Sequence, residues 1–182
     1  MNQEIQEKQF CPYCGSSTES FDDFEGKKRQ RCIKCGAVLY ENPIPATALI
    51  IPQHDDPYKI ILVKRAVEPC KGQYSLPGGF MEIDESPEEC ALREMLEETS
   101  LEGRIKRLLG VKNQPSQLYK MVILVGYEME IIGGKLDASD DAEEAEFFPF
   151  DNHPPIAFET HQWLVDNYEL QITNQENEEL YG

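Results

Sequence analysis

The sequence predicts an α/β protein in which a small cysteine-containing segment precedes a larger domain. Three features lead to this prediction. Two matching Cys-x-x-Cys motifs lie before residue 42, apolar runs with strand-like patterning lie beyond it, and two segments with helical periodicity interrupt and close those runs. We therefore expect a first domain over residues 1–42 and a second over residues 43–182, with almost no linker between them.

The first domain is defined by its cysteines. Cys11-Pro-Tyr-Cys14-Gly and Cys32-Ile-Lys-Cys35-Gly are matching knuckles separated by 17 residues. This spacing is typical of a four-thiolate zinc ribbon, whereas two disulfides are the structural alternative. A segment this short buries too little apolar surface to fold alone, so the zinc ion would form its core.

Charge is distributed unevenly along the chain. The net charge is −17, and residues 1–42 contribute only −1 of it. Such an acidic surface repels nucleic acid, so a nucleic-acid partner is not expected unless a basic patch intervenes. One concentrated basic stretch lies within the cysteine segment and consists of Lys27, Lys28, Arg29, Arg31 and Lys34. It is either a contact for nucleic acid, phosphate or a protein partner, or a solvated hairpin whose charge partly offsets the thiolates.

The larger domain opens with two predicted strands. Residues 45–51 form an apolar run without helical period, and residues 59–66 form a second run after the turn residues 54–57. Lys64 and Arg65 end the second run, where they face either substrate phosphates or solvent. The segment around Tyr74 then leads into a Leu-Pro-Gly-Gly turn at residues 76–79.

The first helix is expected to begin at Ser86. Ser86 can cap it, Pro87 suits the first helical position, and Glu89 completes a capping box. Three carboxylates, those of Glu94, Glu97 and Glu98, share one face of this helix, and Leu92 and Leu96 lie on the opposite side. Like charges one turn apart repel each other, so a divalent cation would stabilise them, and oxygen ligands without His or Cys favour Mg²⁺ or Mn²⁺. The alternative is a solvated acidic face.

The rest of the chain predicts further strands and a closing helix. We expect strands over 104–111 and over 118–132, the latter turning in a hairpin-like bend at Gly133 and Gly134. An acidic loop over 137–146 precedes a strand over 147–150, an amphipathic helix lies within 155–170, and residues 172–182 have the composition of a frayed tail.

The spacing Gly79-x5-Glu85-x7-Arg93-Glu94-Met95-x-Glu97-Glu98-x-Ser100-Leu101 resembles the signature of the Nudix hydrolases, which cleave nucleoside diphosphates linked to another moiety. The resemblance implies an α/β/α sandwich with a mixed sheet, preceded here by the zinc ribbon. The sequence departs from the signature at Ser100, where the family usually has glycine. This departure is expected to change how the helix terminates without affecting the acidic positions.

The same resemblance implies roles for individual residues. Glu94, Glu97, Glu98 and the backbone carbonyl of Gly79 would hold the metal ions, Glu85 would brace the loop, and Arg93 would orient a carboxylate. Nudix enzymes often bring a further carboxylate from the region of the acidic loop to the metal site, and by position Glu144 or Glu146 would serve here; the alternative is a solvated acidic loop. Metal ions would activate a water that attacks phosphorus, and the proton acceptor is either Glu94 or Glu144.

A zinc ribbon followed by this domain resembles two groups of Nudix enzymes. NADH pyrophosphatases carry a Ser-Gln-Pro-Trp-Pro-Phe-Pro array after the helix, whereas residues 113–119 here are Asn-Gln-Pro-Ser-Gln-Leu-Tyr. Plastid-type FAD or ADP-ribose pyrophosphatases share the Tyr40-x-Asn42-Pro43 and Gln117-x-Tyr119 motifs. ADP-ribose or FAD is therefore the expected substrate and AMP one product, with Arg65, Tyr74 and Tyr119 as candidate substrate contacts. An aromatic ring in a strand is alternatively plain core, which applies to Tyr119.

Location and partners follow from composition. The chain contains no apolar run long enough to cross a membrane, and its first ten residues are too polar and acidic for a signal peptide. We expect a cytoplasmic protein with a small-molecule substrate, and a homodimer is an open alternative. The rival hypothesis is a binding module that uses the ribbon for docking. Failure to release a mononucleotide from any dinucleotide, with tight and salt-dependent RNA binding, would favour that rival.

Overall fold

The structure is a computed structural model that describes residues 8–116, 119–138 and 142–181, with the side chains of the C-terminal segment described as far as residue 174. Contacts divide the chain into two compact units, residues 1–43 with 115–121, and residues 44–114 with 122–182. The domain boundary at residues 42 and 43 stays a prediction. The expected motif residue Gln117 and part of the expected acidic loop, 139–141, lie outside the described residues.

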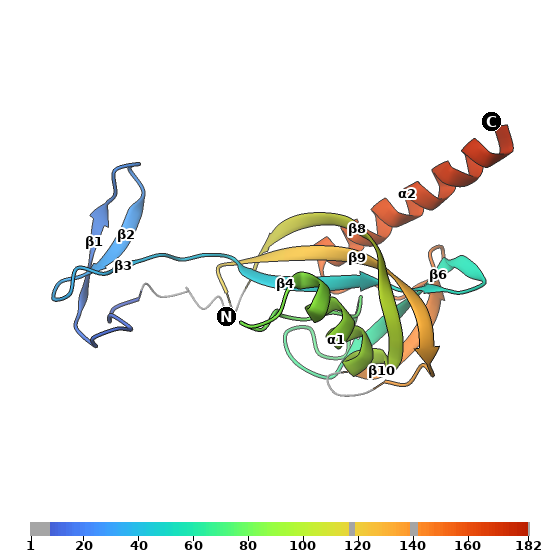
Figure 1. Cartoon of the computed structure of the whole chain (residues 1–182), viewed down its shortest axis with the longest axis horizontal. Helices are drawn as coiled ribbons and strands as arrows, with labels where there is room; N and C mark the ends of the chain where they lie inside the picture. The colour runs from blue at the N-terminus through green and yellow to red at the C-terminus, as the bar shows by residue number, and fades with distance from the viewer. Residues whose placement is uncertain (1–7, 117–118, 139–141, 182) are drawn as a thin grey trace. The chain divides into compact units, whose positions relative to one another are not determined.

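The smaller unit contains an antiparallel sheet in the order β1-β2-β3 (Figure 1). Its strands are β1 (Thr18–Asp22), β2 (Lys28–Cys32) and β3 (Val38–Leu39). Asp23 shapes the β1–β2 turn, because its Oδ1 accepts hydrogen bonds from the amides of Glu25 and Lys27 at 2.9 and 2.8 Å. An aspartate that binds the backbone ahead of it is a common turn-former.

The larger unit is built on two sheets. In the first, β4 (Ile44–Ile50) runs parallel to β9 (Met121–Gly134), which also pairs with β8 (Leu101–Pro115). In the second, β6 (Asp56–Arg65) lies between β10 (Ala142–Pro149) and β5 (Pro52–Gln53), and β7 (Tyr74–Ser75) pairs with β6. The strands are therefore mixed in direction, as expected, but they are divided between two sheets.

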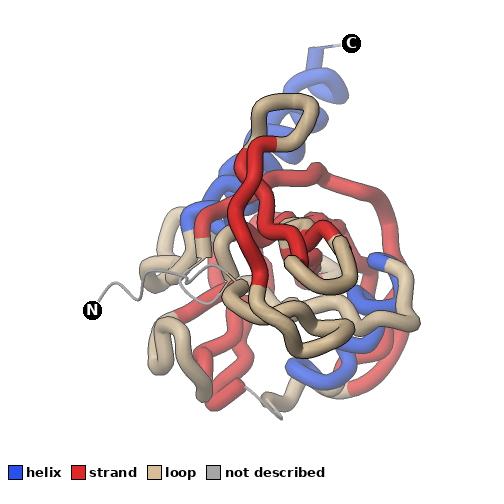
Figure 2. The backbone as a smooth tube through the Cα atoms, turned by 90° about the vertical axis from the view of Figure 1, so that its left-hand side faces the viewer, coloured by secondary structure: helices blue, strands red, loops and turns tan. Residues whose placement is uncertain are grey.

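Two helices pack on these strands, α1 (Pro87–Thr99) and α2 (Glu159–Tyr181), and they lie on different sides of them (Figure 2). Alternate residues of β6 pack toward opposite sides of the sheet. Ile60 and Leu62 join a core cluster with Leu164 of α2, whereas Ile61 and Val63 join a second cluster with Met95 of α1. Strands buried on both faces between helices form an α/β/α sandwich, which confirms the predicted fold class.

Three local expectations are wrong. The bend at Gly133 and Gly134 does not form a hairpin, because β9 ends there and the chain continues into β10 of the other sheet. Glu144 and Glu146 lie within β10 rather than in a loop. Residues 172–181 continue α2 rather than fraying. That segment has no glycine or proline to end the helix, and Ile172 at its start is buried against the core.

Within the described residues, no helix is long and apolar enough to cross a membrane.

A buried carboxylate links two strands beneath α2. Glu128 of β9 is completely buried and pairs with Lys106 and Arg107 of β8, at 2.7 and 2.5 Å. Burial of a charge is costly unless it is paired, and removal of one partner leaves the others uncompensated. The ion group is therefore a stability feature of the β8–β9 pair.

Substitution of Glu128 by alanine is expected to lower the free energy of unfolding by about 3 kcal/mol, the lower part of the range for a broken buried pair, because both cations keep some contact with water. Urea unfolding at neutral pH measures this loss. The matched control is Glu130→Ala on the same strand, where the exposed pair with Arg104 should contribute less than about 1 kcal/mol. Equal losses in the two variants would contradict the interpretation.

Candidate active site

Helix α1 begins where its capping residues predict. Ser86 is the N-cap, its Oγ accepts a hydrogen bond from the Glu89 amide at 3.2 Å, and a Glu89 carboxylate oxygen accepts from the Ser86 amide at 2.8 Å. Pro87 occupies the first helical position. The helix ends at Ser100, whose φ of 57° is left-handed, the conformation that glycine adopts most readily. Serine at this position thus adopts a left-handed ending, and the expected effect of replacing glycine stays a prediction.

The acidic face of α1 points into the protein. Glu94 and Glu98 are each only 8% exposed, whereas Leu92 and Leu96 are 40% and 52% exposed. This orientation reverses the usual preference of apolar residues for the interior. Burial of carboxylates in place of leucines costs stability, and such departures from the folding pattern are concentrated at functional sites.

The turn at residues 76–79 packs closely against β4 and α1. The amides of Leu49 and Thr47 donate to the carbonyls of Pro77 and Gly79, both at 2.8 Å. A Cβ atom at Gly78 would lie 2.2 Å from the Thr47 carbonyl oxygen, and one at Gly79 would lie 2.4 Å from a carboxylate oxygen of Glu94. Glycine is therefore needed at residue 78, where the neighbouring atoms are backbone, whereas a side chain at residue 79 would displace the Glu94 carboxylate.

Glu98 is fixed by this turn, because its Oε2 accepts a hydrogen bond from the Gly78 amide at 2.9 Å. Helix and turn are thus linked directly.

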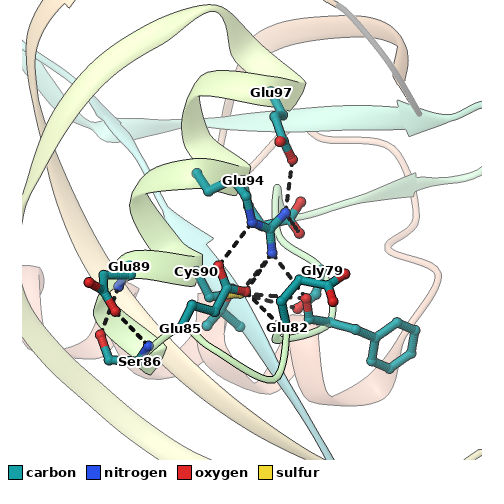
Figure 3. A network of polar contacts seen from close by, with 11 residues as sticks. Gly79, Glu82, Glu85, Ser86, Glu89, Cys90, Glu94 and Glu97 are labelled. Carbon is teal, nitrogen blue, oxygen red and sulfur yellow. Dashed lines mark hydrogen bonds and ion pairs between the residues drawn. The ribbon is translucent and has the colours of Figure 1, made fainter.

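Arg93 organises the remaining carboxylates, those of Glu85, Glu94 and Glu97, which are labelled in Figure 3. Its Nε and Nη2 contact both oxygens of Glu85 at 3.0 and 2.7 Å, and its Nη1 contacts Glu94 and Glu97 at 2.7 and 2.8 Å. Nη2 also donates to the Phe80 carbonyl at 3.1 Å. A guanidinium held at both ends in this way has little freedom to rotate.

The pKa values of Glu85 and Glu94 shift in opposite directions. Arg93 lowers the pKa of Glu85 to about 2. The stability that this pair contributes is accordingly complete above the ordinary glutamate value near 4.5 and is lost as pH falls toward 2. Burial raises the pKa of Glu94, and the charges of Glu97 and Glu85 act in the same sense, against the opposing effect of Arg93.

The glutamate oxygens suit a hard divalent cation, and the structure already stabilises positive charge among them, since Arg93 Nη1 lies between Glu94 and Glu97. Among the described residues, however, the glutamate oxygens do not meet within 4.8 Å as a group of three. Arg93 lies between two of these carboxylates, and Glu98 is turned toward the Gly78 amide. The Gly79 carbonyl accepts from the Thr47 amide at 2.8 Å and from the Cys90 thiol at 3.9 Å, and a carbonyl oxygen is a ligand type that suits a hard cation.

The other candidate residues make their own contacts. Glu144 pairs with Lys64 at 2.7 Å and accepts the Tyr74 hydroxyl at 2.8 Å, and Lys64 holds the pKa of Glu144 below its ordinary value. Arg65 donates to the Pro69 carbonyl at 2.7 Å and stacks over a phenylalanine ring. Tyr119 is 40% exposed and belongs to the smaller unit.

The four predicted zinc ligands come together in the smaller unit. All four sulfur atoms lie within 4.8 Å of one another. The Cys11–Cys35 and Cys14–Cys32 sulfur separations are 3.7 and 3.5 Å, and all four residues are free thiols rather than disulfides. Zn–S bonds of about 2.3 Å at tetrahedral angles place sulfur atoms roughly 3.8 Å apart, so the observed spacing fits zinc.

Backbone amides support the thiolate form of this cluster. The amides of Lys34 and Cys35 donate to the Cys32 sulfur, both at 3.4 Å. Hydrogen bonds from Ser16 lower the pKa of Cys14 to about 6. The Ala37 amide acts in the same sense on Cys35, but the neighbouring thiols and burial outweigh it and raise that pKa to about 11. Zn²⁺ binds thiolates, so the cluster is chemically suited to it.

The basic stretch of the ribbon is largely paired within its own hairpin. Lys28 faces Asp22 and Arg31 faces Glu19 in the β1–β2 register, at 3.5 and 2.6 Å. Two further pairs join Lys27 to Glu25 and Arg29 to Asp23. Cations already matched to carboxylates offer less attraction to a phosphate backbone, which favours the solvated-hairpin interpretation.

The sequence did not indicate His161 as a site residue, because a single histidine on a helix has no diagnostic spacing. This side chain is 7% exposed, and its Nδ1 accepts a hydrogen bond from the Leu76 amide, at the start of the Gly78–Gly79 turn.

A sequence model of the NUDIX domain matches residues 43–166. This chain belongs to the Nudix family. It is 43% identical over 131 residues to an ADP-ribose pyrophosphatase of Methanocaldococcus jannaschii, covering 71% of this chain and 75% of the relative. It is 28% identical over 148 residues to the NAD-capped RNA hydrolase NudC of Pseudomonas aeruginosa, covering 81% of this chain but only half of that protein.

Among solved structures, a NUDIX hydrolase from Nitrosomonas europaea resembles this Nudix protein with a TM-score of 0.76 and 28% identity, covering 89% of this chain and 91% of that one.

Proposed function

We propose that this Nudix protein is a metal-dependent pyrophosphohydrolase that cleaves the diphosphate of ADP-ribose or FAD and releases AMP. The observation that carries the proposal is the inward acidic face of α1. There Glu94 and Glu97 both bind the guanidinium of Arg93, and Glu98 accepts a hydrogen bond from the Gly78 amide. The similarity to an ADP-ribose pyrophosphatase from Methanocaldococcus jannaschii supports the choice of substrate.

Glu94, Glu97, Glu98 and the Gly79 carbonyl would hold Mg²⁺ or Mn²⁺. When bound, the metal supplies charge neutralisation at the phosphoryl oxygens and lowers the pKa of a water molecule. The structural zinc would be held by Cys11, Cys14, Cys32 and Cys35, and it stabilises the ribbon rather than taking part in hydrolysis.

The chain's own residues orient this site. Glu85 holds the guanidinium of Arg93 through two hydrogen bonds, and Arg93 in turn fixes the carboxylates of Glu94 and Glu97. Glu85 and Arg93 therefore act through the carboxylates. These contacts restrain the carboxylates before a cation binds, and their oxygens would then approach one another to hold the same ion.

Glu94 is the proposed proton acceptor for the attacking water. The alternative, Glu144, has one oxygen engaged by the Lys64 ammonium and the other by the Tyr74 hydroxyl. These contacts stabilise the charged form of Glu144 and hold its pKa below the ordinary value, so Glu144 is the weaker proton acceptor. Arg93 binds Oε1 of Glu94, so Oε2 of Glu94 is the oxygen that we assign to accept the proton.

Arg65, Tyr74 and Tyr119 remain the proposed substrate contacts. The Tyr74 ring is held edge-on against Phe148 at 5.4 Å and by its hydroxyl, so it offers a rigid surface. The exposed ring of Tyr119 suits stacking on a flat base or flavin. A cytoplasmic location and a homodimeric state are also proposals.

Two alternatives are less well supported. An NADH pyrophosphatase would be expected to carry the proline-rich aromatic array that residues 113–119 lack. A nucleic-acid-binding module would be expected to present unpaired cations, whereas the four basic residues from Lys27 to Arg31 are paired in the ribbon.

A substrate panel tests the assignment. ADP-ribose, FAD, NADH, diadenosine polyphosphates and nucleoside triphosphates are incubated with the protein and either Mg²⁺ or Mn²⁺, and the products are separated by chromatography. We expect the highest kcat/KM for ADP-ribose or FAD, with AMP and either ribose 5-phosphate or FMN as products. A preference of about tenfold for NADH or a triphosphate, about 1.4 kcal/mol of discrimination, would contradict the substrate assignment while leaving the reaction class intact.

A further inference from the structure

The turn that carries Gly78 and Gly79 is attached to α2 as well as to α1. On the α2 side, the Ala157 amide donates to the Tyr74 carbonyl at 2.8 Å, and Nδ1 of His161 accepts from the Leu76 amide at 3.2 Å. On the α1 side, the Gly78 amide donates to Glu98. The short segment between β7 and α1 therefore connects a buried histidine to a proposed metal ligand.

Side chains satisfy two amides of this turn, that of Gly78 through Glu98 and that of Leu76 through His161. Backbone groups of β4 hold the carbonyls of Pro77 and Gly79. The amide of Leu76, by contrast, is satisfied by a side chain from the other end of the sequence. Leu76 is almost fully buried, so loss of this acceptor would leave a buried amide unpaired. The turn could satisfy that amide only by moving.

The surroundings of His161 keep it neutral. Nδ1 can accept a hydrogen bond only when it carries no hydrogen itself, so the ring proton lies on Nε2. The ring packs against Phe158 at a centroid distance of 5.1 Å, and Arg65 of β6 is the charged group that acts on it. Burial and, second, Arg65 lower its pKa to about 3. The acceptor is thus maintained at neutral pH, and the residue is unsuited to proton transfer.

We propose that His161 is a positioning residue for the metal-binding turn. It fixes the Leu76 amide, so that the Gly78 amide meets Glu98 and Gly79 leaves space for the Glu94 carboxylate. In this way α2, on the far side of the strands from α1, sets the geometry of the acidic face. The inference rests on the proposed function for its catalytic consequence, but its structural consequence is independent of turnover.

Three variants separate positioning from general stability. His161→Leu removes the acceptor and keeps a buried apolar side chain. His161→Asn retains an acceptor, because the asparagine Oδ1 occupies a place similar to histidine Nδ1. Thr160→Val is the matched control, since the buried Thr160 hydroxyl donates to Gln114 of β8 rather than to the turn.

The readouts are hydrogen exchange of the peptide spanning residues 74–80, Mn²⁺ affinity by electron paramagnetic resonance, and kcat and KM for ADP-ribose. In His161→Leu we expect faster exchange, Mn²⁺ affinity and kcat each lower by about tenfold, the scale of one lost hydrogen bond, and an almost unchanged KM. His161→Asn should recover most of the loss. Thr160→Val should leave exchange of that peptide and Mn²⁺ affinity as in the wild type.

Wild-type exchange and Mn²⁺ affinity in a folded His161→Leu protein would overturn the proposal, as would equal effects of Thr160→Val. If His161→Leu does not fold, a His161→Asn protein with weakened Mn²⁺ binding and fast exchange would overturn it too. Absence of turnover in the wild type would count against the proposed function alone, because exchange and Mn²⁺ binding still test the role of His161.

Discussion

Replacement of Glu97 by glutamine is expected to lower turnover of ADP-ribose by about 100-fold or more, without unfolding the protein. Glu97 is the best of the three acidic residues for this test, because its side chain is 42% exposed whereas Glu94 and Glu98 are buried. Its removal leaves the hydrogen bond between Gly78 and Glu98 and the pair between Arg93 and Glu85 in place. Lost activity can then be attributed to lost binding of the divalent metal ion.

Steady-state kinetics under saturating Mg²⁺, together with Mn²⁺ binding and circular dichroism, measures this effect. Glu102→Gln is the matched control, since it removes one exposed carboxylate just after the same helix, and that carboxylate lies near Gly133. Glu85→Gln should reduce turnover less, because Glu85 acts through Arg93. Near wild-type rates in Glu97→Gln would show that the acidic face is structural.

Substitution of Cys32 by serine is expected to abolish zinc binding and unfold the ribbon. The wild-type chain should contain one zinc ion, and removal of a thiolate should release it, because metal binding in a segment this small supplies about 10 kcal/mol or more of its folding energy. Cys32 is also 1% exposed, and its sulfur accepts two backbone hydrogen bonds, so the substitution removes buried contacts as well as a zinc ligand.

Elemental analysis gives the zinc content, and limited proteolysis of residues 9–40 reports the loosened ribbon. Cys70→Ser serves as the control, since Cys70 lies outside the four-sulfur cluster. Full zinc content in Cys32→Ser would contradict the assignment. So would two disulfides in wild-type protein purified under reducing conditions.

Local chemistry accounts for the parts of the site that could be predicted. The start of α1 could be predicted because the capping box of Ser86 and Glu89 involves residues only three positions apart. The cysteine cluster could be predicted because the spacing of the two Cys-x-x-Cys motifs is diagnostic. The inward direction of the acidic face was not predictable in this way. Periodicity places Leu92 and Leu96 opposite the carboxylates, but only the packed structure shows that the leucines are the exposed side.

Contacts between distant residues account for most of what the sequence did not reveal. Glu144 and Lys64 are 80 positions apart and become direct neighbours through the register of β6 and β10. The contact between His161 and Leu76 spans 85 positions, and the buried group around Glu128 depends on the pairing of β8 with β9. Strand register and helix docking decide these contacts, and a single sequence specifies neither locally. The extension of α2 past residue 170 was missed for the same reason, because Ile172 packs into the core.

The most direct test of the central claim is release of AMP from ADP-ribose as Mg²⁺ is returned to protein stripped of divalent cations under conditions that leave the ribbon zinc in place. The account predicts no release without added cation, a saturable recovery with Mg²⁺ in the wild type, and almost no recovery in Glu97→Gln. Release of AMP at an unchanged rate in the stripped protein, or equal recovery in the two proteins, would contradict a metal-dependent reaction at the acidic face of α1.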